Sequence, residues 1–297
     1  MSGLTDRVAA ALSAEVEPAV QAFAERLALA GNARAVLFYG SNLRTRSLEG
    51  VLDFYVLTDG GVESGIWPRV SYHEWTFEGH DLRAKVATMT LATFHAAASG
   101  DLLDTTIWAR FVQPSALVWS RDAEAAEQVH AAVAAAAVTA SRLAVALGPE
   151  AGTVEEFWRA LFRATYRAEF RVEKPGRENS ILEANPAHFA GLLPLALEAG
   201  GVAFGQADER LRPVLPQTER RRLLGWWGKR RRLGKPYNLV RLVRASTTFE
   251  GAARYAAWKI ERHTGVPVKL TPWRERHPLL AAPAVLWQVW RAKGRGR

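Results

Sequence analysis

The chain of 297 residues contains no cysteine. This excludes a disulfide scaffold, a cysteine-ligated zinc or iron–sulfur site, and a thiol nucleophile. It also lacks an uninterrupted apolar run of the roughly 20 residues that a membrane-spanning helix needs. The alanine-rich stretch 131–140 has polar neighbours at both ends, which favours a buried helix. The first residues lack the order of a secretory signal, so we expect a cytoplasmic protein.

Charge is distributed unevenly along the chain. Residues 210–297 contain 22 lysines and arginines against 4 acidic residues, whereas the preceding 209 residues contain 17 against 26. A basic C-terminal third on an acidic body predicts an anionic partner. Charge alone does not decide between nucleic acid and an anionic membrane surface.

The pattern of apolar residues predicts three regions. Short apolar runs and turn residues favour a mixed sheet flanked by helices over residues 1–122. The expected elements there are a helix within 5–30 and strands at 35–39, 51–57, 70–77, 82–89 and 117–119, with a hairpin at 78–81. Residues 123–210 are typical of a mostly helical domain, and residues 211–297 form a basic tail. The expected helices cover 123–147, 153–171 after a capping box, and a third from Asn185-Pro186.

A glycine-serine turn and an aspartate carry the strongest functional signal. The first strand ends in Tyr39-Gly40-Ser41-Asn42, and Asp53 lies within the next strand. Free backbone N–H groups and a hydroxyl at such a turn can hold the phosphates of a nucleoside triphosphate, and glycine permits their close approach. A carboxylate on the neighbouring strand suits Mg²⁺, which prefers oxygen ligands and bridges to phosphates. This arrangement is typical of a nucleotidyltransferase.

Such enzymes ordinarily have a second carboxylate two residues after the first, and here that residue is Tyr55. Asp59 is on the same face of the strand as Asp53 but about 20 Å along it. The candidates for a second metal ligand are therefore Glu49, Glu74 and Asp81.

Further motifs, in order, resemble those of the mitochondrial-type phosphatidate cytidylyltransferases, also called translocator assembly and maintenance proteins. The resemblance rests on segments spread over most of the chain: 38–41, 52–54, 70–73, 82–88, 103–114, 166–173, 185–189 and 246–258. It implies an α/β nucleotidyltransferase domain and the reaction of CTP with phosphatidate to give CDP-diacylglycerol and pyrophosphate, with Mg²⁺.

The resemblance also implies roles for individual residues. Asp53 and Arg110 would be the catalytic residues: Asp53 would hold the metal, and Arg110, like Arg171 and the basic tail, would bind phosphate groups. Nucleotide binding would fall to Tyr39, Gly40, Ser41, Asn42 and either Arg83 or Lys85, and the lipid phosphate side to Arg171, Glu173 and His188. For Arg110 and Arg171 a structural salt bridge is the alternative, and for His188 a packed or capping histidine. Two other functions remain open: a catalytically inactive phospholipid-binding protein on the same scaffold, and a nucleotidyltransferase that acts on RNA.

The basic tail favours a lipid surface over nucleic acid. Residues 278–290 are apolar and rich in tryptophan, and seven residues with four basic side chains follow. Tryptophan favours the membrane interface, and Lys and Arg are attracted to anionic lipids. We expect this segment to lie on a membrane, the alternative being a terminal helix packed on the body. Two basic clusters around Trp226-Trp227 can follow a phosphate backbone, but no established nucleic-acid-binding motif accompanies them.

Overall fold

The computed structural model describes residues 2–65, 68–168, 177–248, 251–276 and 278–294. Its centre is a mixed sheet of five strands in the order β3-β4-β2-β1-β5. The strands are β1 (Ala33–Tyr39), β2 (Leu52–Thr58), β3 (Arg69–Phe77), β4 (His80–Thr90) and β5 (Ser115–Ser120). Only β2 and β4 pair in parallel; the other three pairs are antiparallel. All five predicted strands are confirmed.

Strands β1 and β2 are buried on both faces, which explains their continuous apolar sequences. On one face, Phe38, Phe54 and Val86 pack against helix α2 (Pro18–Ala30). On the other, Leu37 and Tyr55 belong to a larger core that extends into the helical layer. The hairpin predicted at 78–81 joins β3 to β4, with Glu78 and Gly79 at positive φ.

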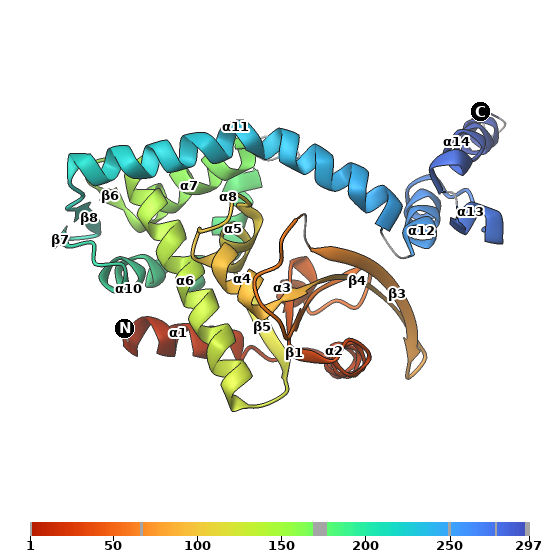
Figure 1. The fold of residues 1–297 in the computed structure, drawn as a ribbon, viewed down its shortest axis with the longest axis horizontal. Helices are drawn as coiled ribbons and strands as arrows, with labels where there is room; N and C mark the ends of the chain where they lie inside the picture. Colours follow the sequence, from red (N-terminus) through yellow and green to blue (C-terminus); the bar gives the residue numbers. More distant parts are fainter. Residues whose placement is uncertain (1, 66–67, 169–176, 249–250, 277, 295–297) are drawn as a thin grey trace.

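The remaining helices surround this sheet and build the second half of the body (Figure 1). They are α1 (Ser2–Leu12), α3 (Ser41–Thr45), α4 (Leu91–Ala98), α5 (Thr106–Phe111), α6 (Ala123–Leu147), α7 (Val154–Ala168), α8 (Arg177–Ala184), α9 (Pro186–Ala190), α10 (Leu192–Ala199), α11 (Gln217–Thr248), α12 (Ala252–Thr264), α13 (Pro272–Arg276) and α14 (Pro278–Gly294). A small sheet of β6 (Gly152–Thr153), β8 (Arg210–Pro213) and β7 (Phe204–Ala207) lies among them.

Two of the sequence signals for helices have clear outcomes. The predicted capping box is present: the Glu156 N–H donates to Thr153 Oγ1 at 3.2 Å, and the Thr153 N–H donates to Glu156 Oε2 at 2.7 Å. The single helix expected within 5–30 is wrong, because α1 ends at Leu12 and α2 begins at Pro18. Proline disfavours the helical conformation in the residue before it, and Glu17 is accordingly extended.

Helix α6 forms the centre of the helical layer. It contacts α1, α4, α5, α7, α10 and α11. Within the described ranges it is the one helix long and apolar enough to cross a membrane, and 67% of its most apolar window is buried inside the fold. Its alanine-rich middle is therefore a core segment, as predicted.

The basic tail begins in β8 and is mostly helical over the rest of its described residues. Helix α11 crosses the helical layer, where Trp227 is buried and packs with Trp226 against Trp108 of α5. Helices α12, α13 and α14 then form an arm that projects from the body beyond β3 (Figure 1). Trp226 and Trp227 consequently serve as packing residues in this layer.

Candidate functional site

The turn after β1 and the aspartate of β2 meet at one edge of the sheet. Tyr39 pairs with Asp53 in the antiparallel ladder, so Gly40 comes directly beside the aspartate. Gly40 has φ of +96°, which L side chains rarely adopt, and a Cβ added there would lie 3.4 Å from Asp53 Oδ2. The glycine thus leaves open the space around the carboxylate.

Lys85 lies opposite Asp53 in the parallel pairing of β2 with β4. Burial raises the pKa of Asp53, and the charges of Lys85 and Arg110 act against that rise. Burial lowers the pKa of Lys85, whereas Asp53 acts to raise it. Each group therefore favours the charged form of the other in a setting that disfavours both charges.

Tyr55 occupies the place where a second carboxylate was expected, and it anchors an arginine. Arg110 Nη1, from α5, donates to Tyr55 Oη at 2.9 Å. The guanidinium lies over the Tyr39 ring, 5.0 Å from its centroid. Tyr55 itself is buried and packs edge-on against Phe111. The sheet and α5 together place Arg110 beside Asp53, where it lowers the aspartate's pKa.

Helices α11 and α12 bring further cations to the site. Besides Arg110, both Lys259 of α12 and Arg241 of α11 lower the pKa of Lys85. Arg241 Nη1 also donates to the buried Asp104 Oδ2 at 2.9 Å. Asp104 accepts in addition from the backbone N–H of Thr106 at the start of α5. This pair therefore ties α11 to the helix that carries Arg110.

Aromatic contacts fix α12 against the edge strand β3. Tyr72 of β3 and Tyr255 of α12 pack with ring centroids 5.4 Å apart, and Asp53 contributes to a raised pKa of Tyr255. A Cβ at Gly251 would lie 2.8 Å from the Tyr72 carbonyl oxygen, so only glycine allows this approach. None of these α11 and α12 residues was predicted individually; the signals that pointed to them were the basic charge of the tail and the 246–258 segment of the resemblance.

Two of the three carboxylates proposed as second metal ligands have other partners. Glu74 accepts from the Tyr72 hydroxyl at 2.9 Å and lies 3.8 Å from Arg83. Asp81 accepts from Thr76 Oγ1, and Glu49 is exposed on the loop after α3. Asp59 pairs with Arg121 at 2.7 Å, at the far end of β2. Throughout the described ranges, no three His, Asp or Glu side chains form a metal-binding group.

The remaining predicted residues divide into several groups. Asn42 Nδ2 donates to the carbonyls of Ser47 and Glu49, which closes the loop after the turn, and Ser41 is exposed at its start. Arg83 stacks on Trp258 of α12, 5.7 Å from the ring centroid, so Lys85 and not Arg83 faces Asp53. Arg171 and Glu173 lie outside the described residues.

His188 packs at the back of α5. Its Nε2 lies 2.9 Å from the carbonyl oxygen of Val112, at the end of that helix. Burial lowers its pKa. This position matches the packed or capping histidine that the sequence left open beside a lipid role.

The residues around Asp53 fit Mg²⁺ only if substrate phosphates supply further ligands. Asp53 is an oxygen ligand whose charge is destabilised by burial, so a divalent cation would stabilise it. One carboxylate is too few for a site built from protein alone, but Mg²⁺ is commonly held by one or two carboxylates together with substrate phosphates. The donor set therefore suits an ion that arrives with a nucleotide.

Comparison with known proteins leaves the site to be interpreted from its geometry. No protein-family model matches the chain, and the curated proteins contain no match.

Proposed function

We propose that the protein is a Mg²⁺-dependent nucleotidyltransferase of the phosphatidate cytidylyltransferase type. The observation that carries this proposal is the meeting of Gly40 with the carboxylate of Asp53. The charges of Lys85 and Arg110 act on the pKa of Asp53, and those of Arg241 and Lys259 act on the pKa of Lys85. One carboxylate among several cations suits two phosphate-bearing substrates better than one neutral substrate.

The proposed reaction needs little acid–base chemistry from the protein. A phosphate oxygen of phosphatidate attacks the α-phosphorus of CTP, the bond from that phosphorus to the β-phosphate oxygen breaks, and pyrophosphate leaves with the electron pair. The attacking oxygen is already anionic, so no proton must be removed. The side chains instead hold two anions together and stabilise the charge that develops at the α-phosphate.

Each cation has a distinct place in this scheme. Arg110 is preorganised because Tyr55 and Tyr39 fix its guanidinium, and such a planar fork matches phosphate oxygens. Lys85 lies next to Asp53 and offers a point charge to the triphosphate. Lys259 is exposed on α12, at the side where a lipid phosphate can approach. Mg²⁺, held by Asp53 and the nucleotide, would supply Lewis-acid stabilisation of the phosphoryl oxygens.

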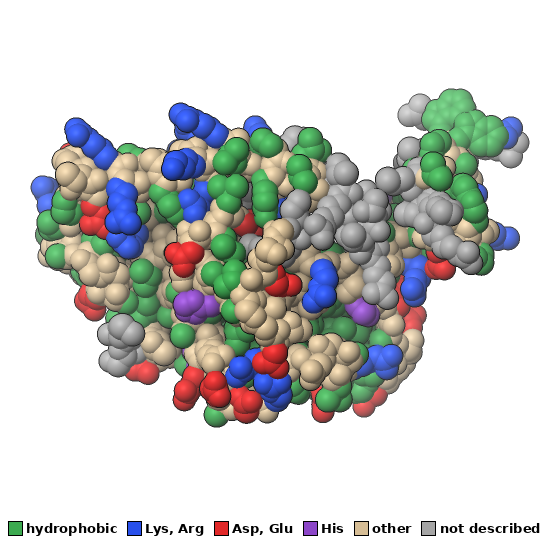
Figure 2. All heavy atoms as spheres, in the orientation of Figure 1, with side chains coloured by type: hydrophobic (Ala, Val, Ile, Leu, Met, Phe, Trp, Pro, Cys, Tyr) green, Lys and Arg blue, Asp and Glu red, His purple; other side chains and the backbone are tan. Residues whose placement is uncertain are grey.

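The arm suits a substrate that is embedded in a membrane. Trp273, Leu280, Trp287 and Trp290 are 54–70% exposed, and hydrophobic side chains gather there in Figure 2. The guanidinium of Arg291 lies over the Trp287 ring, which leaves a cation beside an amphipathic aromatic group. We propose that this arm binds an anionic membrane surface peripherally and that the protein is otherwise cytoplasmic.

A second candidate is an inactive phospholipid-binding protein on the same scaffold. The specific observation that favours it is Tyr55, a packed and hydrogen-bonded residue where a second carboxylate would be. Transfer to RNA has less support, because Trp226 and Trp227 pack against Trp108.

Pyrophosphate release separates these functions. The full chain is incubated with Mg²⁺ and each of the four nucleoside triphosphates, with phosphatidate vesicles, with RNA, or with neither. We expect release that requires CTP, phosphatidate and Asp53, and Asp53→Asn lowers it by at least about a hundredfold. Vesicle binding without release in the wild type would support the inactive protein, and release that requires RNA would support the third function.

A further inference from the structure

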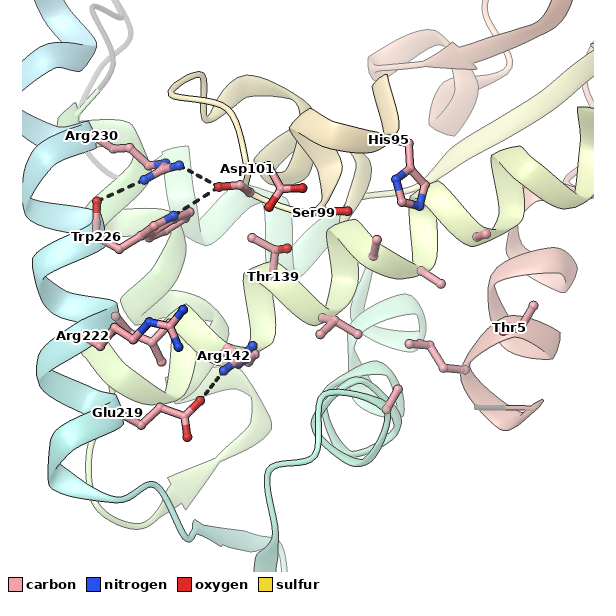
Figure 3. Close-up of a pocket in the computed structure, with 18 residues that line it drawn as sticks. Thr5, His95, Ser99, Asp101, Thr139, Arg142, Glu219, Arg222, Trp226 and Arg230 are labelled. Carbon is pink, nitrogen blue, oxygen red and sulfur yellow. Dashed lines mark hydrogen bonds and ion pairs between the residues drawn. The ribbon is translucent and has the colours of Figure 1, made fainter. Parts of the chain in front are cut away.

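A second cavity lies in the helical layer, apart from Asp53. Its volume is about 760 Å³, and it opens between α1, α4, α6 and α11 (Figure 3). That size is within the range of small-molecule sites. The residues that act on Asp53 and Lys85 are not among those that line it. We refer to it as the α6 groove.

The floor of the α6 groove is a stripe of small apolar side chains. Ala131, Ala134, Ala135 and Val138 follow one another on one face of α6, and Leu4 and Ala199 flank them. Ala134, Ala135 and Val138 are only half-buried, so space remains above them. From Ala131 to Arg142 this face runs for about 16 Å at the rise of an α-helix. The shape is long, narrow and apolar.

The α11 side of the groove carries the charge. Arg142, Arg222 and Arg230 line it, together with Glu219 and Asp101 (Figure 3). Glu219 is paired with Arg142. The charge of Asp101 raises the pKa of Arg230 and so acts against the lowering that burial causes. Arg222 is exposed on the wall. This end of the groove is therefore net positive, whereas His95 and Thr5 mark the other end.

Two buried donors in this wall lack acceptors. The Nε atoms of Arg142 and Arg230 are buried and have no hydrogen-bond partner. Arg230 is 7% exposed, and its Nη2 donates to the carbonyls of Gly100 and Leu102 while the guanidinium stacks on Trp226. These Nε atoms are buried even with the groove empty, so a ligand in it cannot reach them, and both guanidinium groups already pair through their Nη atoms. The exposed Arg222 is therefore the cation of this wall that a ligand in the groove can meet.

We propose that the α6 groove binds a single-chain anionic amphiphile. Its alkyl chain lies along the alanine stripe of α6, and its anionic head lies at the α11 wall near Arg222. The head can be a carboxylate, as in a fatty acid, or a phosphate monoester; both offer acceptor oxygens to guanidinium groups. An amphiphile with a neutral or cationic head group lacks the negative charge that complements the arginines of this wall.

Titration calorimetry on the full chain tests this without nucleotide, each amphiphile being kept below its micelle concentration. The probes are dodecanoate, dodecyl phosphate, dodecyltrimethylammonium and inorganic phosphate. We expect at least one of the two anionic amphiphiles to bind, and which one binds identifies the head. The cationic amphiphile and inorganic phosphate bind at least about tenfold more weakly, since each lacks one half of the interaction. Equal binding of the cationic amphiphile would overturn the proposal.

Matched variants locate the site and exclude binding to the arm. Ala135→Phe fills the groove and weakens binding by about tenfold or more, whereas Ala123→Phe, exposed at the start of the same helix, leaves it unchanged. Arg222→Glu weakens binding of the anions, and its exposed neighbour Arg221→Glu does not. Thermal unfolding verifies the fold of each variant. If Ala135→Phe unfolds, the Arg222 pair alone decides; unchanged affinity in Arg222→Glu would overturn the proposal. Asp53→Asn retains full binding, so this result is independent of the nucleotidyl-transfer test.

Discussion

Asp53 and Lys85 lie opposite each other on the parallel strands β2 and β4, and burial works against the charge of both. A charge pair of this kind adds little stability to a fold, because desolvation offsets the mutual attraction. Its place beside Gly40 instead fits the proposed function, in which the carboxylate would bind Mg²⁺ and the ammonium would bind phosphate.

Asp53→Asn is expected to stabilise the protein at neutral pH. The folded state raises the pKa of Asp53 above its ordinary value of 3.8. The wild type therefore loses stability as the pH rises from that value through the folded pKa, and the neutral asparagine escapes this loss. Urea denaturation at several pH values measures the difference, which should vanish in acid.

Asp59→Asn is the matched control for that pH series. The hydrogen bond from Arg121 lowers the pKa of Asp59, so its ionised form favours the folded state. The variant should be less stable than the wild type at neutral pH, and the two should become equally stable as the pH falls below 3.8. If both variants changed the free energy of unfolding in the same direction at neutral pH, the environment assigned to Asp53 would be contradicted.

Gly40→Ala should impair both stability and transfer. Its φ of +96° costs an L residue about 1–2 kcal/mol, and the added methyl group would lie 3.4 Å from Asp53 Oδ2. Gly61→Ala is the control, because no atom lies within 4 Å of its Cβ position. Thermal unfolding and pyrophosphate release measure the two effects. Equal activity of the two variants would argue against a ligand at the Gly40 turn.

Tyr55→Phe should lower transfer by about tenfold while leaving the fold intact. It removes the hydroxyl that accepts from Arg110 and retains the ring that packs on Phe111. Hydrogen bonds to charged groups contribute roughly 1.5–3 kcal/mol. Arg110→Lys should resemble it, because an ammonium keeps the charge but loses the planar fork. Steady-state kinetics measures both, and a double variant no slower than either single one would confirm that the two residues act together.

Arg241→Met should destabilise the protein by about 3 kcal/mol, since it leaves the buried carboxylate of Asp104 without its cation. Replacing both, as Arg241→Met with Asp104→Asn, should restore part of that loss. Urea denaturation of the two single variants and the double variant gives the coupling free energy. A coupling near zero would mean that the pair does not join α11 to α5.

Trp287→Ala with Trp290→Ala should weaken binding to vesicles of anionic phospholipid. Both indoles are exposed on α14, and exposed tryptophans favour the membrane interface. Leu29→Ala is the control, because Leu29 is 70% exposed but lies on α2 of the body. Sedimentation with vesicles at physiological salt gives the bound fractions. Equal fractions for both variants would place membrane contact elsewhere or exclude it.

Local patterns predicted the local parts of this structure. Thr153 and Glu156 form the expected reciprocal cap because the motif needs only its own backbone. The Gly40 turn and Asp53 come together because they lie on strands that are consecutive in sequence and paired in the sheet. The break before Pro18 shows the limit even locally, since the apolar spacing continues across it while the backbone does not.

Long-range parts of the site were not predictable in this way. Arg241 and Lys259 act on Lys85 only because α11 and α12, more than 150 residues later in the chain, pack against the edge strand β3. Their basic residues look alike in sequence, yet Arg230 is buried while Arg222 is exposed. Composition reports the charge of such a segment, whereas packing decides which cations meet a ligand. Tyr55 likewise acquires its role from an arginine 55 residues away.

The close approach of Gly251 to Tyr72 also covers part of an outer strand of the sheet. β3 is an outer strand of the five-stranded sheet, and such strands can recruit a strand from another molecule and start aggregation. The Tyr72 carbonyl lies under the start of α12, and the Tyr255 ring lies beside it. Helix α12, which also carries Lys259, thus covers the part of this outer strand around Tyr72, and displacing the helix would expose backbone that can pair with a strand of another molecule.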